Sequence, residues 1–570
     1  SFTNAARDNF DEKLNNDNVR CSTFHKLGKD IIDDGKFKVS IAPENYLYTV
    51  IEEYLNKIII NNSEKSAHLI QLYAYYMHNQ NNQDKDFGDV IELEKGYDLE
   101  TLKYKYNKIH ELKTLKEEKV KSFQELIIAN YLFLHGINYR YEQQYKYNTK
   151  SYTHRQYHPD FYLPDYDIYI EHFGINKEGR APQYNEIEEK RYLDGIRYKR
   201  GIHKLYKTKL IETYSFDFDD YNIEKILETK LKSNGVEFHD LNYHEIVDTI
   251  AKINNEEMTS FYNLISKFIK MFKGNNYELT KFDEFYKDSS KKKNIREMYL
   301  IEIIKDIYIY YQNKLTSEEY IDFDDMINLA TQRVINRFDK KISYIIIDEF
   351  QDISYSRYKL VKAIQDKTHA KIVAVGDDWQ SIYRFSGCDL NLFVNFDHYF
   401  PHPKIMYINN TYRNCQSLID IAGTFIMQND KGQIKKKLIS WKEDIEFPIE
   451  YYYYKKNILS ATEYAIKKLK KYGCKKIAIL GRNNSDIEKY GYAKVSNKKE
   501  IDMSEKFNCN VVFTTVHKAK GIEYDGVIIC NMDNYIAGFP NKMSDDPILD
   551  YVSLTKDDYL YEEERRLLYE

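Results

Sequence analysis

The sequence lacks the features that mark several specialised classes of protein. Proline occurs nine times, and the six cysteines are scattered without a CxxC pair, at positions 21, 388, 415, 474, 509 and 530. This spacing excludes a disulfide framework and a thiolate zinc site, so we expect reduced thiols and a cytoplasmic location. No apolar run approaches the ~20 residues that span a bilayer, and neither a signal-peptide pattern nor a fixed-period repeat is visible.

An excess of charge of one sign is also lacking. The formal net charge is −5 over 570 residues, so the whole chain carries no basic signal for nucleic acid. This does not exclude DNA binding, because a local groove supplies the field that a phosphate backbone meets. The length, with 42% apolar residues, predicts several globular domains.

The most informative stretch is YIIIDEFQDI at residues 344–353. Its apolar run without alternation predicts a strand buried on both faces. Asp348 and Glu349 follow at the carboxyl end of this strand, where parallel α/β sheets bind ligands. The first carboxylate can hold Mg²⁺, and the second can activate a water that attacks a phosphate. Taken alone, the stretch also fits a buried strand followed by an acidic helix start.

Polar residues follow other apolar runs in the same way. Gln380 lies just past the run 371–375, where a neutral amide can sense a phosphate, and Trp379 and Tyr383 offer flat faces to a base. Further stretches place hydroxyl, basic or acidic side chains near predicted strand ends: SFTNAARDNF (1–10), CSTFHKLGKDI (21–31), NNTYRN (409–414), FTTVHKAKGIEYDGVII (513–529) and EEERRLLYE (562–570).

This ordered set resembles the motifs of the UvrD/Rep type of superfamily 1 DNA helicases, and the helicase IV branch in particular. SFTNAA resembles motif Ia, STFHKLG motif Ib, IIIDEFQD motif II and VGDDWQSIYRFSG motif III. TYRN resembles motif IV, TTVHKAKGIEYD motif V, and EEERRLLY the first half of motif VI. Because these motifs occur in the family's order, chance agreement is negligible.

The resemblance implies an α/β fold with two RecA-like parallel-sheet motor domains, ATP between them and single-stranded DNA across their top. It implies Mg²⁺ at Asp348, water activation by Glu349 and γ-phosphate sensing by Gln380. From the second motor domain, Arg413 would act as an arginine finger, and Arg566 would lie near the phosphates. The resemblance also implies three nucleotide contacts: Tyr412 stacks on adenine, Glu523 contacts the ribose, and Lys520 contacts the nucleotide.

The same resemblance implies the path of the DNA. Contacts to backbone phosphates and sugars are expected from Thr3, Asn4, Thr23, His25, Thr515 and His517. Base stacking or wedging is expected from Phe24, Trp379 and Tyr383. The family steps 3′ to 5′, and this polarity rests on the resemblance alone.

One motif of the family is absent. No glycine-rich phosphate loop GxxxxGK[ST] occurs in the sequence, although the family places one just before motif Ia. We expect that residues lie upstream of Ser1 and downstream of Glu570, and that the polypeptide as given hydrolyses ATP poorly. An ATPase that truly lacks the loop is the alternative.

About 300 residues separate motif Ib from motif II, which predicts a large, mostly helical insertion in the first motor domain. Helical spacing of apolar residues occurs at 43–60, 64–79, 99–134, 243–272, 294–312 and 322–329. In the second motor domain, strands are predicted at 404–408, 476–480, 511–515 and 526–530. The predicted domains are motor domain 1A (1–40 and 316–400), helical insertion 1B (41–117 and 217–315), a nuclease-like domain (118–216), and motor domain 2A with a reduced 2B (401–570).

A second candidate site lies inside the insertion, in YHPDFYLPDYDIYIEHFG at residues 157–174. Two strand-like runs flank a Pro-Asp-Tyr-Asp turn. A turn centred between Asp165 and Tyr166 sets Asp160 opposite Glu171, with Cβ atoms roughly 5 Å apart. Two carboxylates at that separation can share one Mg²⁺. A predicted helix at 122–134 carries Glu125, and the basic stretch 191–210 can contact a phosphate backbone.

This arrangement resembles the PD-(D/E)xK nuclease fold, as a nuclease-like insertion. Asp160 would be the first acid, Glu171 the second, and Glu125 the acid of the first helix. The pattern departs at the lysine, because Phe173 stands two residues after Glu171. Lys199 is the candidate substitute from the following helix. An active nuclease and an inactive DNA-gripping or docking module both stay open, as does an ordinary hairpin with exposed acids.

Three hypotheses for the whole chain follow. The first is an ATP-driven DNA translocase or helicase with a nuclease-like module, used in DNA repair or in defence against foreign DNA. The second is a nuclease whose motor only senses or loads DNA, and the third is a non-catalytic DNA-binding scaffold. The expected cofactors are ATP and Mg²⁺. The expected partners are single-stranded or partly duplex DNA and a protein of a repair or defence complex, with no membrane.

Overall fold

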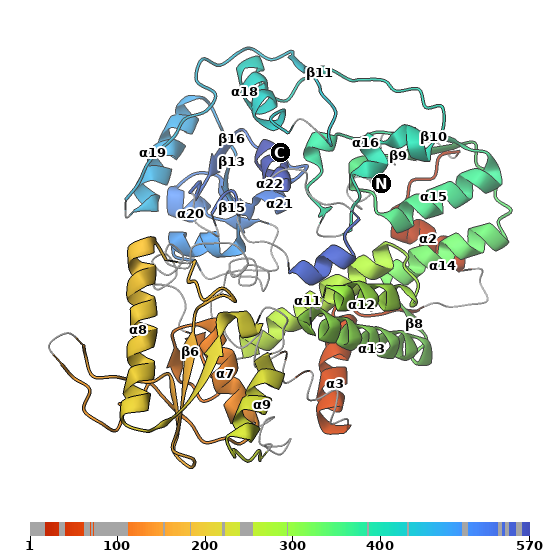
Figure 1. Ribbon diagram of the computed structural model, residues 1–570. Helices are drawn as coiled ribbons and strands as arrows, with labels where there is room; N and C mark the ends of the chain where they lie inside the picture. The colour runs from red at the N-terminus through yellow and green to blue at the C-terminus, as the bar shows by residue number, and fades with distance from the viewer. Residues whose placement is uncertain are drawn as a thin grey trace.

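A computed structural model describes most of the chain (Figure 1). The described residues are 18–33, 40–61, 69, 72, 112–151, 154–182, 184–218, 223–239, 255–292, 295–384, 387–429, 432–455, 457–492, 500–533, 538–541, 546–554 and 561–570. The predicted DNA contacts Thr3 and Asn4, and nearly all of the helix predicted at 64–79, lie outside these residues.

Side-chain caps fix where several helices begin. Thr23, Ser122 and Asn185 accept backbone N–H groups in the first turns of α2 (Phe24–Ile32), α7 (Phe123–Leu134) and α8 (Glu186–Leu205). Asp322 and Asn457 do the same for α14 (Phe323–Asn336) and α19 (Ile458–Lys471). Each cap satisfies a donor that has no partner within its helix.

The region predicted as motor domain 1A, called the first motor domain below, contains two parallel strands, β9 (Tyr344–Ile347) and β10 (Lys371–Ala374). Buried residues of α2, α14 and α15 (Tyr355–Thr368) share one apolar cluster with the end of β9. The short elements of this domain are η3 (Phe350–Asp352), η4 (Asp378–Gln380), α16 (Asn391–Val394) and α17 (Phe396–Tyr399).

The prediction that the strand at 344–347 is buried on both faces is wrong for the described structure. Tyr344 is 59% exposed and Ile346 is 64% exposed, while Ile347 is buried. The reason is that successive side chains of a strand point to opposite faces. Ile345 and Ile347 pack in the apolar cluster of the first motor domain, whereas Tyr344 and Ile346 lie on the other face.

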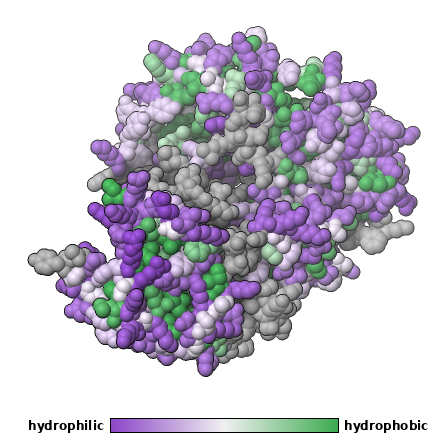
Figure 2. Space-filling view, viewed as in Figure 1, coloured by the Kyte–Doolittle hydropathy of each residue, from purple (hydrophilic) through white to green (hydrophobic). Residues whose placement is uncertain are grey.

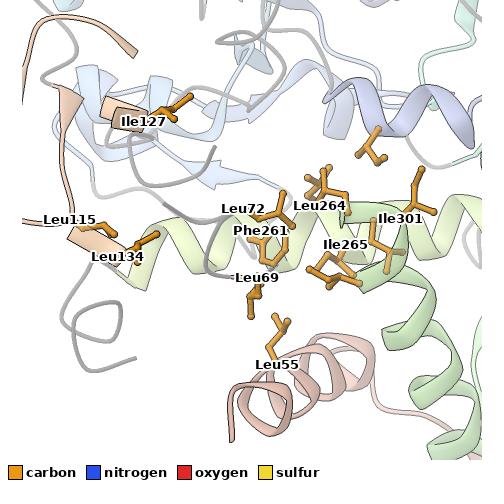
Figure 3. Close-up of a cluster of buried hydrophobic side chains, with 14 of the residues drawn as sticks. Leu55, Leu69, Leu72, Leu115, Ile127, Leu134, Phe261, Leu264, Ile265 and Ile301 are labelled. Atoms are coloured by element: carbon orange, nitrogen blue, oxygen red, sulfur yellow. The ribbon is translucent and has the colours of Figure 1, made fainter. Parts of the chain in front are cut away.

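A helical layer lies beside the first motor domain. It consists of α3 (Tyr46–Asn61), α11 (Asn255–Gly274), α12 (Lys281–Lys291) and α13 (Ile295–Ser317), with a small parallel pair of β1 (Ser40–Ile41) and β8 (Tyr320–Ile321). Leu55, Phe261, Ile265 and Ile301 are labelled in its buried apolar cluster (Figure 3).

A segment from the C-terminal part of the chain enters this helical layer. It contains η7 (Pro547–Tyr551), and Ile548, Leu549 and Val552 are buried in the same apolar cluster as α11, α12 and α13. We call residues 546–552 the strap. Its buried residues make it a structural part of the helical insertion, although the sequence places it between motifs V and VI.

The insertion also carries a small α/β unit. Its four-stranded sheet has the order β4–β5–β6–β7, in which β4 (Arg140–Tyr141), β5 (Phe161–Leu163) and β6 (Ile168–Phe173) are antiparallel and β7 (Lys209–Tyr214) runs parallel to β6. In chain order, α7 precedes β4 and α8 connects β6 to β7. Next come η2 (Ser215–Phe218) and α9 (Ile223–Ser233).

The region predicted as motor domain 2A, called the second motor domain below, has a sheet of order β14–β15–β13–β16. The parallel strands β13 (Ile477–Gly481), β15 (Val511–Thr515) and β16 (Gly526–Ile529) form its main part, and β14 (Ile501–Asp502) is antiparallel at one edge. Every residue of β13 and β15 is buried, as predicted for parallel strands. Its other elements are β11 (Asn410–Thr411), α18 (Gln416–Ile426), β12 (Ile439–Ser440), η6 (Asn484–Tyr490), α20 (Ser504–Phe507), α21 (Val516–Ala519) and α22 (Glu562–Tyr569).

Two element predictions are corrected. A single helix at 99–134 is wrong, because the hairpin of β2 (Leu112–Lys113) and β3 (Lys119–Val120) precedes α7. The strand predicted at 404–408 is also wrong: this segment has no assigned strand, and Met406 and Ile408 are 77% and 81% exposed. Pairing begins instead at β11, beside β12.

The surface in view is mostly hydrophilic, including the region of α8 (Figure 2). Among the helices in the described ranges, none combines the length and apolar character needed to cross a bilayer.

Candidate functional site

The carboxyl ends of β9 and β10 bring the residues of motifs II and III together. Asp348 and Glu349 follow β9, and Phe350 N–H donates to the Val375 carbonyl at 2.9 Å, which ties the two strand ends. Glu349 has a φ of 51°, in the left-handed region. A residue other than glycine is uncommon there, and such strain gathers at functional sites.

Gln351 links the two strand ends through its amide. Its Nε2 donates to Glu349 Oε2 at 2.6 Å, and its Oε1 accepts from Asp377 N–H at 3.0 Å. A Cβ on Gly376 would lie 2.4 Å from Gln351 Oε1, so glycine is required for this approach. Gln380 Nε2 donates to Asp377 Oδ2 at 3.0 Å, which extends the network to the predicted phosphate sensor.

Lys520 joins the second motor domain to this network. Its Nζ donates to Asp352 Oδ2 and to the Gln380 carbonyl, both at 2.6 Å, and both side chains of the ion pair are less than a tenth exposed. Burial raises the pKa of the Asp352 carboxyl to about 6, against the opposing charge of Lys520. The structure therefore gives Lys520 a contact across the domain interface, and its predicted contact with nucleotide stays a prediction.

Arg413 and Glu523 lie together on the second motor domain. Arg413 Nε donates to Glu523 Oε1 at 3.0 Å, and both side chains are more than half exposed. Burial raises the pKa of the Glu570 carboxyl to about 7; Lys520 and Arg413 oppose this rise, and Asp377 and Glu349 add to it.

The helix α22 makes several contacts in this interface. Glu563 accepts from Arg384 N–H at 3.3 Å, which links α22 to motif III. Arg482 Nη2 donates to Glu564 Oε1 at 2.6 Å. Arg566 is buried and its guanidinium contacts Glu562 in the same helix, so its predicted place near the phosphates stays a prediction.

The structure corrects the predicted base stacking by Phe24 and Trp379. Phe24 is 8% exposed and packs in the apolar cluster of the first motor domain. Trp379 is 1% exposed, and its indole Nε1 donates to the Ile434 carbonyl at 2.9 Å. Tyr569 covers the Trp379 ring edge-on at a centroid distance of 5.3 Å. Neither ring offers a free face to a base.

The remaining DNA candidates within the described residues have different surroundings. The Thr23 hydroxyl caps α2, Thr515 is buried at the end of β15, and Tyr383 donates to the His517 carbonyl at 3.3 Å. Burial lowers the pKa values of His25 and His517 to about 4, with further lowering by nearby cations. Both histidines are therefore neutral at pH 7 and do not act as cations toward phosphate.

The second candidate site is assembled by the α/β unit. The register of β5 and β6 pairs Phe161 with Ile170 and Leu163 with Ile168, which confirms the predicted turn. Asp160 and Glu171 accordingly lie close together, and Asp160 Oδ2 accepts from His172 N–H at 2.7 Å. Burial, reinforced by the charge of Glu171, raises the pKa of Asp160 to about 8.

Glu125 and Lys199 approach the same pair. Glu125 accepts from Tyr141 OH at 2.6 Å, and burial together with the charge of Asp160 raises its pKa. Lys199 Nζ donates to Glu171 Oε2 at 2.5 Å. Burial lowers the pKa of Lys199, but Glu171 and Asp160 outweigh this effect and the net shift is upward. The four predicted residues therefore converge.

A buried hydrogen-bond chain stands behind Glu171. Tyr157 OH donates to Glu171 Oε1 at 2.6 Å and lies 3.0 Å from His203 Nε2, and His203 Nδ1 lies 2.8 Å from the Thr208 hydroxyl. Sequence reasoning missed Tyr157 and His203. The signal for Tyr157 was its place two residues before the Pro-Asp pair, but nothing in the sequence indicated His203.

Cation binding fits the two sites to different degrees. At motif II, one carboxylate, with phosphate oxygens and waters, is a usual Mg²⁺ environment, and half-buried Asp348 fits it. At Glu171, both carboxylate oxygens already accept hydrogen bonds, from Tyr157 and Lys199. A divalent cation can therefore bind Glu171 only if the Lys199 ammonium moves away from Oε2. Within the described ranges, no group of three or more His, Cys, Asp or Glu side chains is arranged to hold a metal ion.

Comparisons with known proteins agree with the motor motifs. Residues 170–401 match the UvrD/REP helicase N-terminal domain, and residues 491–569 match the UvrD-like helicase C-terminal domain. The first match includes motifs II and III, and the second includes the residues of motifs V and VI. The chain therefore contains UvrD/Rep-type helicase domains.

Several helicases are similar to parts of the chain. DNA helicase IV of Escherichia coli (strain K12) is 30% identical over 295 residues, which are 49% of this chain and 40% of that protein. ATP-dependent DNA helicase PcrA of Bacillus subtilis (strain 168) is 30% identical over 183 residues, 31% of this chain and 23% of that protein. ATP-dependent DNA helicase Rep of Buchnera aphidicola subsp. Acyrthosiphon pisum (strain APS) is 34% identical over 140 residues, which are 24% of this chain and 21% of that protein. The chain spans less than half the length of each.

Proposed function

We propose that the protein is an ATP-dependent DNA translocase and helicase that moves 3′ to 5′ on single-stranded DNA. The observation that carries this proposal is the network in which motif II and III residues of one motor domain meet motif V and VI residues of the other. Lys520, Asp352 and the Gln380 carbonyl form its centre. The two helicase domain matches support the same activity.

In this proposal each motif residue has one task at the nucleotide. Asp348 holds Mg²⁺, which neutralises charge on the phosphates when bound. Glu349 accepts the proton of the attacking water, and the amide of Gln351 fixes its orientation. Gln380, already joined to Asp377, senses the terminal phosphate.

Closure of the two motor domains depends on Arg413. In the structure its guanidinium pairs with exposed Glu523. An exposed pair of this kind contributes only about 0–1 kcal/mol, so Arg413 can exchange Glu523 for a γ-phosphate at little cost. The charge-assisted contact exists only when the domains close, and its loss after hydrolysis lets them open. Tyr412 then stacks on adenine, and Glu523 is freed for the ribose.

The DNA lies across both motor domains in this proposal. Thr23, His25, Thr515 and His517 contact its backbone, as do Thr3 and Asn4, and Tyr383 lies beside a base. Because His25 and His517 are neutral, they serve as hydrogen-bonding groups.

A strand-displacement assay tests the motor. Duplexes with a 3′ or a 5′ single-stranded tail are mixed with the intact protein, ATP and Mg²⁺, with Glu349→Gln as the matched control. We expect displacement of the 3′-tailed duplex, and a loss of at least about 100-fold in the control because a general base contributes 10²–10⁴ in rate. Displacement that persists in Glu349→Gln would contradict the assigned role.

We also propose that residues 118–216 form a PD-(D/E)xK nuclease-like domain. The helix, three antiparallel strands, helix and parallel strand, with Asp160, Glu171 and Lys199 converging, support this. If the domain is active, Lys199 polarises the phosphate in place of the lysine missing two residues after Glu171. The alternative, an inactive DNA-gripping module, is favoured by the occupied oxygens of Glu171.

Cleavage of single-stranded and duplex DNA with Mg²⁺ or Mn²⁺ separates these two alternatives. An active domain loses cleavage in Asp160→Asn and Glu171→Gln, while unwinding stays intact. If the unaltered protein cleaves DNA without net unwinding, and these variants lose that cleavage, the second hypothesis holds, in which the motor only senses or loads DNA. A non-catalytic scaffold predicts neither activity, and a phosphate loop encoded ahead of Ser1 would refute it.

The proposed setting is DNA repair or defence against foreign DNA in the cytoplasm. The DNA is single-stranded or partly duplex, and a partner protein of a repair or defence complex is expected to deliver it. Loss of survival after DNA damage or after phage challenge, measured in a deletion strain, distinguishes these two settings.

A further inference from the structure

Two exposed aromatic rings lie side by side on the second motor domain. Tyr412 is 69% exposed and Trp441 is 67% exposed. Their ring centroids are 6.1 Å apart, with 22° between the ring planes. A tryptophan this exposed is unusual, since its large apolar surface favours burial. The other tryptophan of the chain, Trp379, is buried.

The backbone holds the two rings in this arrangement. β11 and β12 pair in parallel with Thr411 beside Ser440, and Trp441 N–H donates to the Thr411 carbonyl at 3.0 Å. The Ser440 hydroxyl donates to the Asn414 carbonyl at 2.6 Å, and the same hydroxyl oxygen accepts from Lys442 N–H at 2.9 Å. Because residues on both sides of the pair are fixed, the rings stay neighbours without being packed under other side chains.

The position of the rings points to a nucleotide. Tyr412 directly precedes Arg413, whose guanidinium pairs with Glu523 of the motif V stretch. In the proposed function, Tyr412, Arg413 and Glu523 all contact the nucleotide, so Trp441 lies beside the expected position of the base. A flat, neutral surface beside cationic and acidic groups suits the base of a nucleoside triphosphate.

We propose that Trp441 is a second aromatic residue of the nucleotide-base site, and that a purine base stacks against the Tyr412–Trp441 pair. This inference rests on the proposed ATP-driven function. A base placed between two rings needs two ring contacts of ~3.5 Å each, about 7 Å in all. The ring centroids are 6.1 Å apart, so a base enters between the rings only when the pair opens. A small opening of the pair, or stacking on its outer face, brings the base into contact. A purine overlaps the rings more than a pyrimidine does.

Tryptophan fluorescence tests the proposal directly. The intact protein is titrated with ATP and with CTP, with Trp441→Phe and Trp379→Phe as matched variants. We expect ATP to quench more strongly than CTP, with the quenching lost in Trp441→Phe and kept in Trp379→Phe. Trp441→Ala should weaken ATP binding about tenfold, as expected for one lost stacking partner, whereas Trp441→Phe should retain most of the affinity.

Three results would overturn the proposal. One is wild-type ATP affinity in Trp441→Ala when Tyr412→Ala binds weakly. Another is quenching that remains in Trp441→Phe. The third is quenching of Trp441 by single-stranded DNA and not by ATP, which would assign the pair to the DNA path. Calorimetry separates these results from a failure of the proposed function, because in that case the unaltered protein binds no ATP at all.

Discussion

The strap gives the sharpest prediction about how the molecule holds together. Arg296 of α13 donates to both carboxylate oxygens of Asp546, and these side chains are 4% and 0% exposed. Asp546 Oδ1 also accepts from Ile548 N–H at 3.0 Å, and Asn275 Nδ2 donates to the Val552 carbonyl at 2.6 Å. Arg296→Met removes the cation and leaves the Asp546 carboxylate buried without it.

The expected loss follows from burial. Removing one partner of a buried ion pair costs about 3–5 kcal/mol, because the other charge stays in a medium of low dielectric. For a cooperative unit of 150–250 residues, each kcal/mol lowers Tm by about 2–4 °C. The transition of the helical insertion should therefore fall by at least about 6 °C. The double variant Arg296→Met/Asp546→Leu should recover most of this loss, since it leaves no unpaired charge.

Scanning calorimetry measures the shift, and limited proteolysis shows whether the strap becomes accessible to cleavage. The control is Lys232→Ala, which breaks an exposed pair with Glu228 whose side chains are 58% and 46% exposed. An exposed pair contributes about 0–1 kcal/mol, so Tm should change little. A shift in Arg296→Met no larger than that of the control would refute the reasoning.

Three further predictions follow from the sites. Burial raises the pKa of Asp160 from 3.8 to about 8, so the stability this proton adds is complete below about pH 4 and is lost as pH rises to 8; the Tm of the α/β unit should fall between about pH 4 and 8 and level off above pH 8, and Asp160→Asn should abolish this dependence, as measured by differential scanning fluorimetry. Gln351→Ala frees Glu349, so kcat for ATP hydrolysis should drop about 100-fold with KM nearly unchanged; a change in KM alone would argue against a positioning role. Because the pKa of His517 is lowered to about 4, His517→Gln should leave the salt dependence of DNA binding unchanged at pH 7; a shallower slope in filter binding would show that the imidazole is charged.

Local patterns in the sequence predicted much of the framework. The Pro-Asp-Tyr-Asp turn set the register of β5 and β6, and uninterrupted apolar runs located β13 and β15. These features depend on neighbouring residues, because turn chemistry and side-chain alternation act over a few positions. The helicase motifs located the residues around Asp348 in the same way, although their roles stay predictions.

Features that depend on distant partners escaped the sequence. Trp379 is buried by contacts with Ile434 and Tyr569, which are far from it in the chain, so its place in motif III gave no sign of burial. The packing of the strap against α11, α12 and α13 also joins residues far apart in the chain, so nothing in the sequence indicated it. The run 404–408 has the composition of a strand, but a strand also needs a pairing partner. In the structure β12 pairs with β11, which begins at Asn410, after the end of this run.

The central claim is that both motor domains contribute to one nucleotide site, with Glu349 from the first and Arg413 from the second. The rate of ATP hydrolysis by the intact protein, with and without single-stranded DNA, tests this most directly when Glu349→Gln and Arg413→Ala are compared with the unaltered chain. We predict stimulation by DNA and a loss of about 10³-fold or more in Arg413→Ala, as for other arginine fingers. DNA-stimulated hydrolysis that survives in Arg413→Ala would contradict the shared site.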